Sequence, residues 1–271
     1  MANHVEIKQQ GAVVEIMLNR PPVNAIDYKT SCELYEAFRV LQQDPALRVG
    51  IVYGAGERLF SAGWDLKEYA ETGEALVESG EYELGPGGLG GLPEFWGLKK
   101  PVIAAVNGKA IGGGFEMLLA ADLILAAEHA EFRLPEIQLG FLPDGGGIQR
   151  LPKRLPYNVA ADLMLTGRPL SATEAQHYGL VKEVVAADQL LPRARELAQQ
   201  IAEGAPLALQ AMKEVMTACE SLSVEASFSH TRQAWKGDSG LPLLEKMLRS
   251  DDYLEGSRAF TEKRSPVYKG C

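Results

Sequence analysis

The stretch AIGGGFEM (110–117) joins an apolar, strand-like run to an apolar, helix-like run through three consecutive glycines. The preceding segment, PVIAAVNG (101–108), is apolar on both faces, which is typical of a strand in a covered sheet. Glycines that open a helix expose backbone N–H groups and the positive end of the helix dipole. The stretch therefore predicts a strand, a site for an anion and a helix, with Glu116 in the first helical turn.

Two interpretations of Glu116 follow from the residues alone. Glycines also allow close backbone packing, and an acid in a first helical turn is favoured by the dipole without any catalytic role. Several other sites are not supported, because the chain contains no GxxxxGK[ST] or GxSxG motif and GAGERL (54–59) holds only two glycines of a GxGxxG pattern. The four histidines show no HExxH or paired spacing, so we predict no metal site.

Outward from this stretch, strand and helix signals alternate along the chain. The predicted strands are VVEIMLN (13–19), VGIVYG (49–54), DLILAA (122–127) and LVKEVV (180–185). Helices are predicted over 27–44 and 171–179, the second from a capping-box pattern of Ser171 and Glu174. From Asp188 onward only helical patterns remain. We predict an α/β core over residues 1–200 and a C-terminal helical region over 201–271.

A long Gly- and Glu-rich segment, 71–97, interrupts the alternation. It exceeds the length of an ordinary connection, so it is predicted to be a mobile or functional loop that holds at most a short helix.

Composition restricts the function and the location. The 271 residues carry a net charge of −9, which argues against a nucleic-acid or anionic-membrane surface. No apolar run reaches the roughly 18 residues of a membrane span, and the first residues lack a signal-peptide pattern. Three scattered cysteines are typical of free thiols in a reducing compartment. We expect a cytoplasmic protein.

A second acid makes a catalytic interpretation of Glu116 stronger. Glu136 follows Pro135 at a predicted turn, and Asp144 begins a second glycine cluster, DGGG (144–147). Two carboxylates in apolar, glycine-lined surroundings can share a water molecule while their pKa values are pushed apart. Such a pair suits acid–base chemistry on a carbon acid or an alkene. Asp144 has two interpretations: a turn or helix-capping residue, or a third acid in the site.

Three motifs in this order resemble the crotonase (enoyl-CoA hydratase/isomerase) superfamily: FSAGWDLKE (60–68), PVIAAVNGKAIGGGFEMLLAADLILAA (101–127) and LPEIQLGFLPDGGGIQRLP (134–152). The resemblance covers almost the whole chain. Within the superfamily, the segments 61–67, 85–108 and 259–270 are most similar to the carnitinyl-CoA dehydratases. The implied fold is a spiral of strand–strand–helix turns with a C-terminal helical region that builds homotrimers, or hexamers made of two trimers.

The resemblance implies an acyl-CoA hydratase or dehydratase and assigns roles within it. The anion is the enolate oxygen of an acyl-CoA thioester, held by the backbone N–H groups of Gly113 and Trp64. In hydration Glu116 acts as base toward water and Glu136 delivers the proton to the α-carbon, and these roles reverse in dehydration. Family hydratases keep both acids. Asp144 also occurs in dienoyl-CoA isomerases, so an isomerase that uses Asp144 is the alternative.

Coenzyme A is implied as part of the substrate, with no separate cofactor. Its adenine is expected near Ser61 and Ala62, and its phosphates near Lys67 and Lys263. A trimethylammonium acyl group needs aromatic faces or a carboxylate, and the candidates are Trp64, Phe95 and Trp96. Further candidates in the same loop are Tyr82 with Glu78, Glu81 and Glu83. A non-catalytic acyl-CoA-binding or RNA-binding protein is a third alternative, which the paired acids and the acidic charge disfavour.

Overall fold

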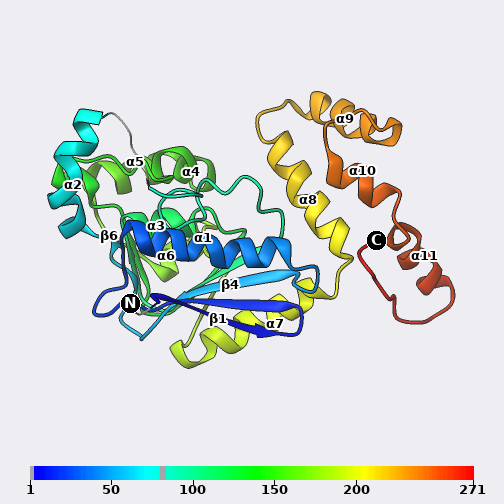
Figure 1. The fold of residues 1–271 in the computed structure, drawn as a ribbon, viewed down its shortest axis with the longest axis horizontal. Coiled ribbons are helices and arrows are strands. Elements are labelled where there is room, and N and C mark those ends of the chain that lie inside the picture. The colour runs from blue at the N-terminus through cyan, green and yellow to red at the C-terminus, as the bar shows by residue number, and fades with distance from the viewer. Residues whose placement is uncertain (1–2, 80–83) are drawn as a thin grey trace. The chain divides into compact units, whose positions relative to one another are not determined.

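The computed structural model describes residues 3–79 and 84–271. The chain divides into two compact units. The first comprises Met1–Leu98 with Val102–Ala198, and the second comprises Lys99–Pro101 with Gln199–Cys271. In Figure 1 the first unit runs from blue to yellow-green and the second from yellow to red.

The largest sheet of the first unit has the strand order β1-β2-β4-β7-β9-β12, in which β1 is antiparallel to β2 and the other pairs are parallel. Its strands are β1 (Val5–Gln10), β2 (Val13–Leu18), β4 (Val49–Gly54), β7 (Val102–Val106), β9 (Leu123–Ala127) and β12 (Glu183–Val185). Three of the four strands predicted above, β2, β4 and β9, match within a residue at each end. The fourth is shorter, because 180–182 lie outside β12.

Smaller sheets pair the strands that follow. The order β11-β10-β8-β5 forms one sheet and β3-β6 another. Their strands are β3 (Ala25–Ile26), β5 (Leu59–Ser61), β6 (Gly63–Trp64), β8 (Lys109–Ile111), β10 (Glu131–Arg133) and β11 (Leu170–Ser171). The helices are α1 (Tyr28–Gln43), α2 (Leu66–Ser79), α3 (Gly113–Leu118), α4 (Gly147–Arg154), α5 (Tyr157–Thr166), α6 (Ala172–His177) and α7 (Leu190–Ala202), with 3₁₀ turns η1 (Glu136–Leu139) and η2 (Ala187–Gln189).

The order of these elements repeats. A strand of the large sheet is followed by one or two strands of the smaller sheets and then by a helix in β4–β5–β6–α2, β7–β8–α3 and β9–β10–η1–α4. This sequence of elements confirms the strand–strand–helix spiral that the resemblance implied. Each repeat ends with a helix near the carboxyl end of a short strand, and these ends carry the acids and glycines of the predicted site.

Local chemistry explains how the first helices begin. Asp27 caps α1, where its carboxylate accepts a hydrogen bond from the Thr30 N–H at 2.7 Å. The helix buries Leu34, Phe38 and Leu41, and it contacts β1, β2 and β4 (Figure 1).

The start of α6 follows half of the predicted capping box. The Ser171 hydroxyl accepts from the Glu174 N–H at 3.1 Å, as predicted. The Glu174 carboxylate instead binds the guanidinium of Arg168 at 2.8 Å, which is the stronger, charge-assisted partner.

Two predicted boundaries differ from the structure. Residues 71–79 are helical, because α2 begins at Leu66 and its Glu- and Ala-rich sequence continues without proline to Ser79. The run predicted as one strand over 101–108 ends at Val106, and β8 begins at Lys109 in a different sheet. Gly108 joins them where a Cβ would lie 2.5 Å from backbone atoms of Arg58, so only glycine allows this crossing.

The second unit is helical, as the sequence predicted for this region. Its further elements are α8 (Pro206–Cys219), α9 (Val224–Gln233), η3 (Ala234–Lys236), α10 (Pro242–Leu248) and α11 (Asp252–Thr261). The buried Glu214 carboxylate of α8 accepts hydrogen bonds from the Leu243 and Leu244 N–H groups, each at 3.0 Å. It therefore satisfies donors at the start of α10, which lacks a side-chain cap of its own.

One buried ion pair fixes α7 to the large sheet within the first unit. Glu15 on β2 has a side chain only 1% exposed, and its two oxygens accept from Arg195 at 2.7 and 2.8 Å. We predict that Arg195→Met lowers the free energy of unfolding by about 1–3 kcal/mol, because it leaves a buried carboxylate without its cation. The Glu15→Met/Arg195→Met double variant should recover part of this loss in urea denaturation. An equal loss in both variants would contradict the prediction.

Candidate active site

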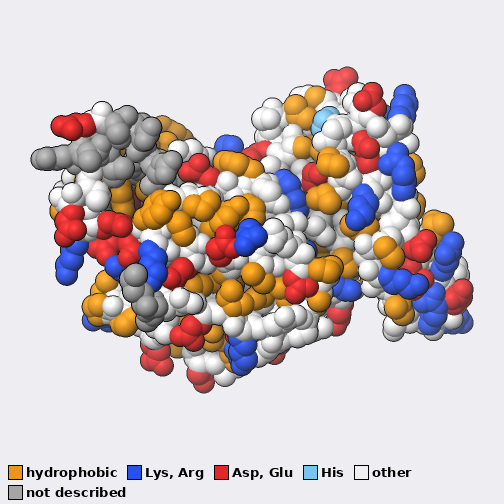
Figure 2. Space-filling model, in the orientation of Figure 1, with side chains coloured by type: hydrophobic (Ala, Val, Ile, Leu, Met, Phe, Trp, Pro, Cys, Tyr) orange, Lys and Arg blue, Asp and Glu red, His pale blue; other side chains and the backbone are white. Residues whose placement is uncertain are grey.

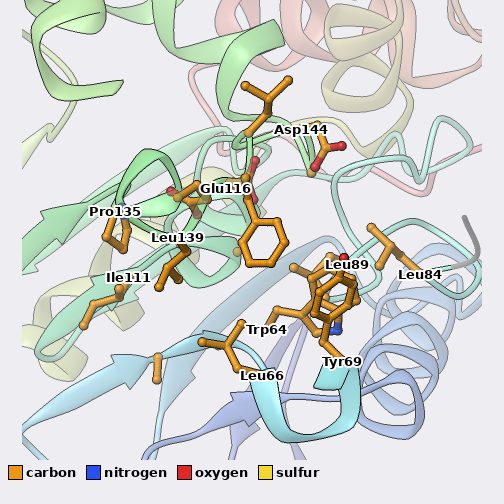
Figure 3. A pocket seen from close by; sticks show the side chains of 17 residues that line it. Trp64, Leu66, Tyr69, Leu84, Leu89, Ile111, Glu116, Pro135, Leu139 and Asp144 are labelled. Atoms are coloured by element: carbon orange, nitrogen blue, oxygen red, sulfur yellow. The ribbon is translucent and has the colours of Figure 1, made fainter. Parts of the chain in front are cut away.

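A cavity of about 300 Å³ lies within the first unit. Residues from four segments line it: 62–69, 84–89, 111–116 and 135–145. In Figure 3, Glu116 lies near the centre, with Pro135 and Ile111 on one side and Asp144 and Leu84 on the other. The segments that were predicted to carry the chemistry therefore meet at one place.

Glu116 projects from the first turn of α3 and is only 4% exposed. Its Oε1 accepts a hydrogen bond from the Gly147 N–H at 2.9 Å, so the carboxyl group meets the N-terminus of α4. The second glycine cluster makes room for it. A Cβ on Gly145 would lie 2.9 Å from Glu116 Oε2, and one on Gly147 would lie 3.1 Å from Oε1.

Glu136 occupies the first position of η1, directly after Pro135. The first glycine cluster makes room for this acid in turn: Gly112 has a φ of +53°, and a Cβ there would lie 2.8 Å from Glu136 Oε1. The other oxygen, Oε2, is buried without a hydrogen-bond partner among the described residues. A buried oxygen without a partner is expected where a substrate or water binds.

Burial sets the proton affinity of both acids. It raises the pKa of Glu116 to about 8, the negative charges of Glu136 and Asp144 add to the rise, and the Gly147 and Gly145 N–H groups oppose it. Burial also raises the pKa of Glu136 to about 7, again with a contribution from Asp144. Near neutral pH the pair therefore holds about one proton, which is a suitable state for acid–base catalysis.

The backbone N atoms of Gly113 and Trp64 lie close together beside the acids. A Cβ on Gly63 would be 2.8 Å from Gly113 N, and a Cβ on Gly113 would be 3.5 Å from Trp64 N. Gly113 opens α3, so its N–H has no acceptor within the helix. The buried Ser61 hydroxyl holds the turn before Trp64, because it donates to the Asn24 carbonyl at 2.7 Å and accepts from the Gly63 N–H at 3.0 Å.

Of the aromatic side chains that the sequence suggested, Trp64 lines the cavity, whereas Phe95 and Trp96 do not. Trp64 lines it, in ring contact with Tyr69 at 4.6 Å, and Tyr69 meets Phe141 edge-on at 5.1 Å. Phe95 and Trp96 are not among the lining residues, so their prediction as cavity aromatics is wrong. Phe95 packs against Tyr35, while Trp96 is 67% exposed beneath the Arg150 guanidinium.

One acidic candidate of the same loop is described, and it does not lie at the cavity. Glu78 is exposed on α2 and does not line it. Glu81, Tyr82 and Glu83 lie outside the described residues.

The remaining candidates divide between the cavity and the surface. Ala62 and Asp144 line the cavity, and Ser61 lies behind it. Gly146 holds the N-cap position of α4 without a side-chain bond, so the interpretation of Asp144 as the cap of this helix is wrong. Lys67 is exposed on α2, next to the lining residue Leu66. Lys263 is exposed in the second unit.

The sequence did not predict that the Gly147 N–H is a partner of Glu116, although Gly147 belongs to the DGGG cluster (144–147). It also missed Tyr69 and Phe141, for which the sequence offers no signal beyond their aromatic character.

Neither a metal site nor a membrane-spanning helix is found among the residues that the structure describes. In the parts of the chain that the structure describes, no group of His, Cys, Asp and Glu could hold a metal ion. Across those same residues, every helix is too short or too polar to span a membrane. On the face drawn in Figure 2, the described basic side chains are interspersed with acidic ones.

The spiral of strand–strand–helix units and the paired buried acids define a protein of the crotonase fold class. Residues 8–271 match the family model described as enoyl-CoA hydratase/isomerase, and the chain belongs to this family.

Relatives and solved structures agree with this assignment. The chain is 49% identical over 270 residues to the carnitinyl-CoA dehydratases of Proteus mirabilis and Salmonella typhi, with full coverage of both chains in each comparison. Its structure is similar to that of an enoyl-CoA hydratase from Mycobacterium tuberculosis, with a TM-score of 0.87 and 36% identity over 100% of both chains. A Bacillus anthracis enoyl-CoA hydratase gives a TM-score of 0.85 at 35% identity, over 99% of this chain and 100% of the other. The predicted family and fold are thereby confirmed.

The raised pKa of Glu116 predicts a stability change with a definite sign. The folded state binds this proton more tightly than the unfolded state, so the wild-type protein loses stability as pH rises from about 4.5 to about 8. Glu116→Gln keeps an acceptor for the Gly147 N–H but does not ionise. At pH 8.5 the free energy of unfolding of Glu116→Gln should be about 1–3 kcal/mol higher than that of wild type. At pH 5 the difference between the two proteins should be much smaller.

Urea denaturation at the two pH values measures this effect. The exposed Glu57→Gln variant serves as the control and should show no such dependence. A Glu116→Gln variant that is less stable than wild type at pH 8.5 would contradict the prediction.

Proposed function

We propose that this protein is an acyl-CoA hydratase/dehydratase that removes or adds water across the α,β bond of an acyl-CoA thioester, with carnitinyl-CoA and crotonobetainyl-CoA as its favoured substrates. The observation that carries the reaction type is the pair of acids, the buried Glu116 and the half-buried Glu136, which face one cavity with pKa values near neutral. Similarity to the carnitinyl-CoA dehydratases over the whole chain supports the substrate.

In the proposed mechanism the thioester oxygen accepts from the Gly113 and Trp64 N–H groups. In dehydration the Glu136 carboxylate takes the α-proton, and negative charge moves onto that oxygen as an enolate. The enolate then re-forms the carbonyl, the α,β double bond forms, and the β-hydroxyl leaves as water with a proton from Glu116. Hydration is the reverse. Donors fixed in advance stabilise charge that develops only during the reaction, and one such donor contributes on the order of 100-fold in rate.

The protonation state of the pair fits the dehydration direction. Glu116 is buried and Glu136 is half-buried, so removal from water opposes ionisation more at Glu116 and favours the shared proton there. Glu136 is then the ionised base and Glu116 the acid that protonates the leaving hydroxyl. For hydration, the same proton must first reside on Glu136.

The remaining roles are part of the same proposal. Coenzyme A would lie along the backbone of Ser61 and Ala62, with its phosphates near Lys67. Lys263 would bind the phosphates of the coenzyme A held by a neighbouring subunit. The protein would act in the cytoplasm as a homotrimer or a hexamer, without a further cofactor. Residues 1–200 would carry the active site and residues 201–271 the assembly surface.

The position of Asp144 supports an alternative activity. Asp144 lines the cavity close enough for its charge to raise the pKa of both glutamates. An enoyl- or dienoyl-CoA isomerase that uses Asp144 for proton transfer is therefore the alternative, as is a general enoyl-CoA hydratase without preference for the trimethylammonium group.

A side-by-side hydration assay with crotonobetainyl-CoA and crotonyl-CoA tests the proposal. We expect wild type to prefer crotonobetainyl-CoA, and Glu116→Gln and Glu136→Gln each to lower kcat by at least about 100-fold. Preference for crotonyl-CoA would indicate a general hydratase. Isomerisation that survives both Gln substitutions but is lost in Asp144→Asn would indicate the isomerase.

The pKa values of the pair predict the pH profile of kcat/KM. Below about pH 7 the pair gains a second proton and loses its base, and above about pH 8 it loses its last proton and its acid. We therefore expect a bell-shaped profile with its optimum between about pH 7 and 8. A profile that is flat from pH 5 to 10 would contradict this assignment of acid and base.

A further inference from the structure

The charged side chains that line the cavity, among the described residues, are all acidic. Three of its lining residues are acids, namely Glu116, Glu136 and Asp144, and no Lys, Arg or His occurs among the described residues that line it. The proposed reaction uses two of these acids. The third acid, Asp144, has no role in that reaction, and its negative charge opposes the ionisation of Glu116 and Glu136.

Asp144 differs from Glu116 in exposure, and it lies toward a different side of the cavity from Ile111 and Pro135. Its side chain is exposed, whereas that of Glu116 is buried. In Figure 3 it lies on the same side of Glu116 as Leu84, away from Ile111 and Pro135. Leu66 also lines the cavity and precedes Lys67, the proposed phosphate contact. A carboxylate that met the phosphates of coenzyme A would repel them, so the Asp144 side suits the far end of the acyl chain.

An aromatic surface completes the surroundings. The rings of Trp64, Tyr69 and Phe141 are in successive contact and all line the cavity. Aromatic faces attract a cation without offering hydrogen bonds, and this suits an ammonium group whose nitrogen carries no hydrogen. A carboxylate adds long-range attraction to such a cation.

We propose that Asp144 and the rings of Trp64, Tyr69 and Phe141 form a subsite for a compact quaternary ammonium group at the end of the acyl chain. The inference rests on the proposed function and deepens it, because it names the residues that select a cationic acyl group. Asp144 is then a specificity residue that acts on binding, and not the proton-transfer acid of an isomerase.

Binding of unreactive ligands tests the subsite separately from catalysis. The probes are 4-(trimethylammonio)butanoyl-CoA and its neutral carbon isostere, 5,5-dimethylhexanoyl-CoA, which differ only in the charge of one atom. Neither has the double bond or hydroxyl group that the reaction needs. Titration calorimetry gives the ratio of the two Kd values for wild type, Asp144→Asn, Asp144→Glu and the exposed-surface control Asp188→Asn.

We expect wild type to bind the cationic probe at least about 10-fold more tightly than the isostere. Asp144→Asn should remove most of this preference by weakening the cationic probe alone. Asp144→Glu should retain part of it, and Asp188→Asn all of it. An unchanged preference in Asp144→Asn would overturn the proposal, as would equal weakening of both probes or a wild-type protein that prefers the isostere.

The aromatic part of the subsite has its own test. Tyr69→Leu removes the ring but keeps apolar bulk, whereas Tyr69→Phe keeps the ring. The preference for the cationic probe should fall about 3-fold or more in Tyr69→Leu and persist in Tyr69→Phe. Equal preference in the two variants would exclude Tyr69 from the subsite.

The binding ratio and the hydration assay can fail independently. Cation-selective binding without turnover of crotonobetainyl-CoA would refute the proposed function and leave the subsite intact. Turnover of crotonobetainyl-CoA with no dependence of the binding ratio on Asp144 would refute the subsite alone.

Discussion

Each of the two paired acids lies where a glycine of the other acid's motif leaves room for it, and the site depends on this reciprocal fit. Glu116 belongs to the first glycine cluster but lies against Gly145 and Gly147 of the second. Glu136 lies just before the second cluster but against Gly112 of the first. A methyl group at any of these glycines would meet a carboxylate oxygen, so the constraint is steric before it is electrostatic.

This fit has an electrostatic consequence. Because the acids are removed from water, both pKa values rise toward neutral, and the protein holds them at the expense of stability at high pH. The N-termini of two short helices limit that penalty and supply donors. The first N–H of α4 satisfies Glu116, and the first N–H of α3 lies close to the Trp64 N–H in the position proposed for the thioester oxygen. The short strands of the smaller sheets hold both helices in place.

The cavity also explains how one family fold can serve different acyl groups. The reacting acids and backbone donors come from α3, η1 and the turn at β6, which the strand–strand–helix repeats fix. The far side of the cavity comes from α2 and from the segments 84–89 and 141–145, which lie outside the strands. Substitution of Asp144 would change the charge of this side of the cavity, whereas Gly145 next to it cannot gain a side chain without meeting Glu116.

The sequence by itself determined much of this protein, because its signals were local. Strands β2, β4 and β9, the start of α1, the helical C-terminal region and the two acids beside glycines were all predicted from patterns within a few residues. Tertiary structure decided which groups meet. The Gly147 N–H lies 31 residues from Glu116 along the chain, and the contact of Tyr69 with Phe141 spans a gap more than twice as long. The chain crosses from β7 to β8 where Gly108 lies against the backbone of Arg58. Phe95 packs against Tyr35 and Trp96 lies beneath Arg150, and neither ring lines the cavity. Periodicity and capping depend on neighbouring residues, so the sequence predicts them directly. Contacts across sheets depend on how distant segments pack, and no local sequence pattern predicts that packing.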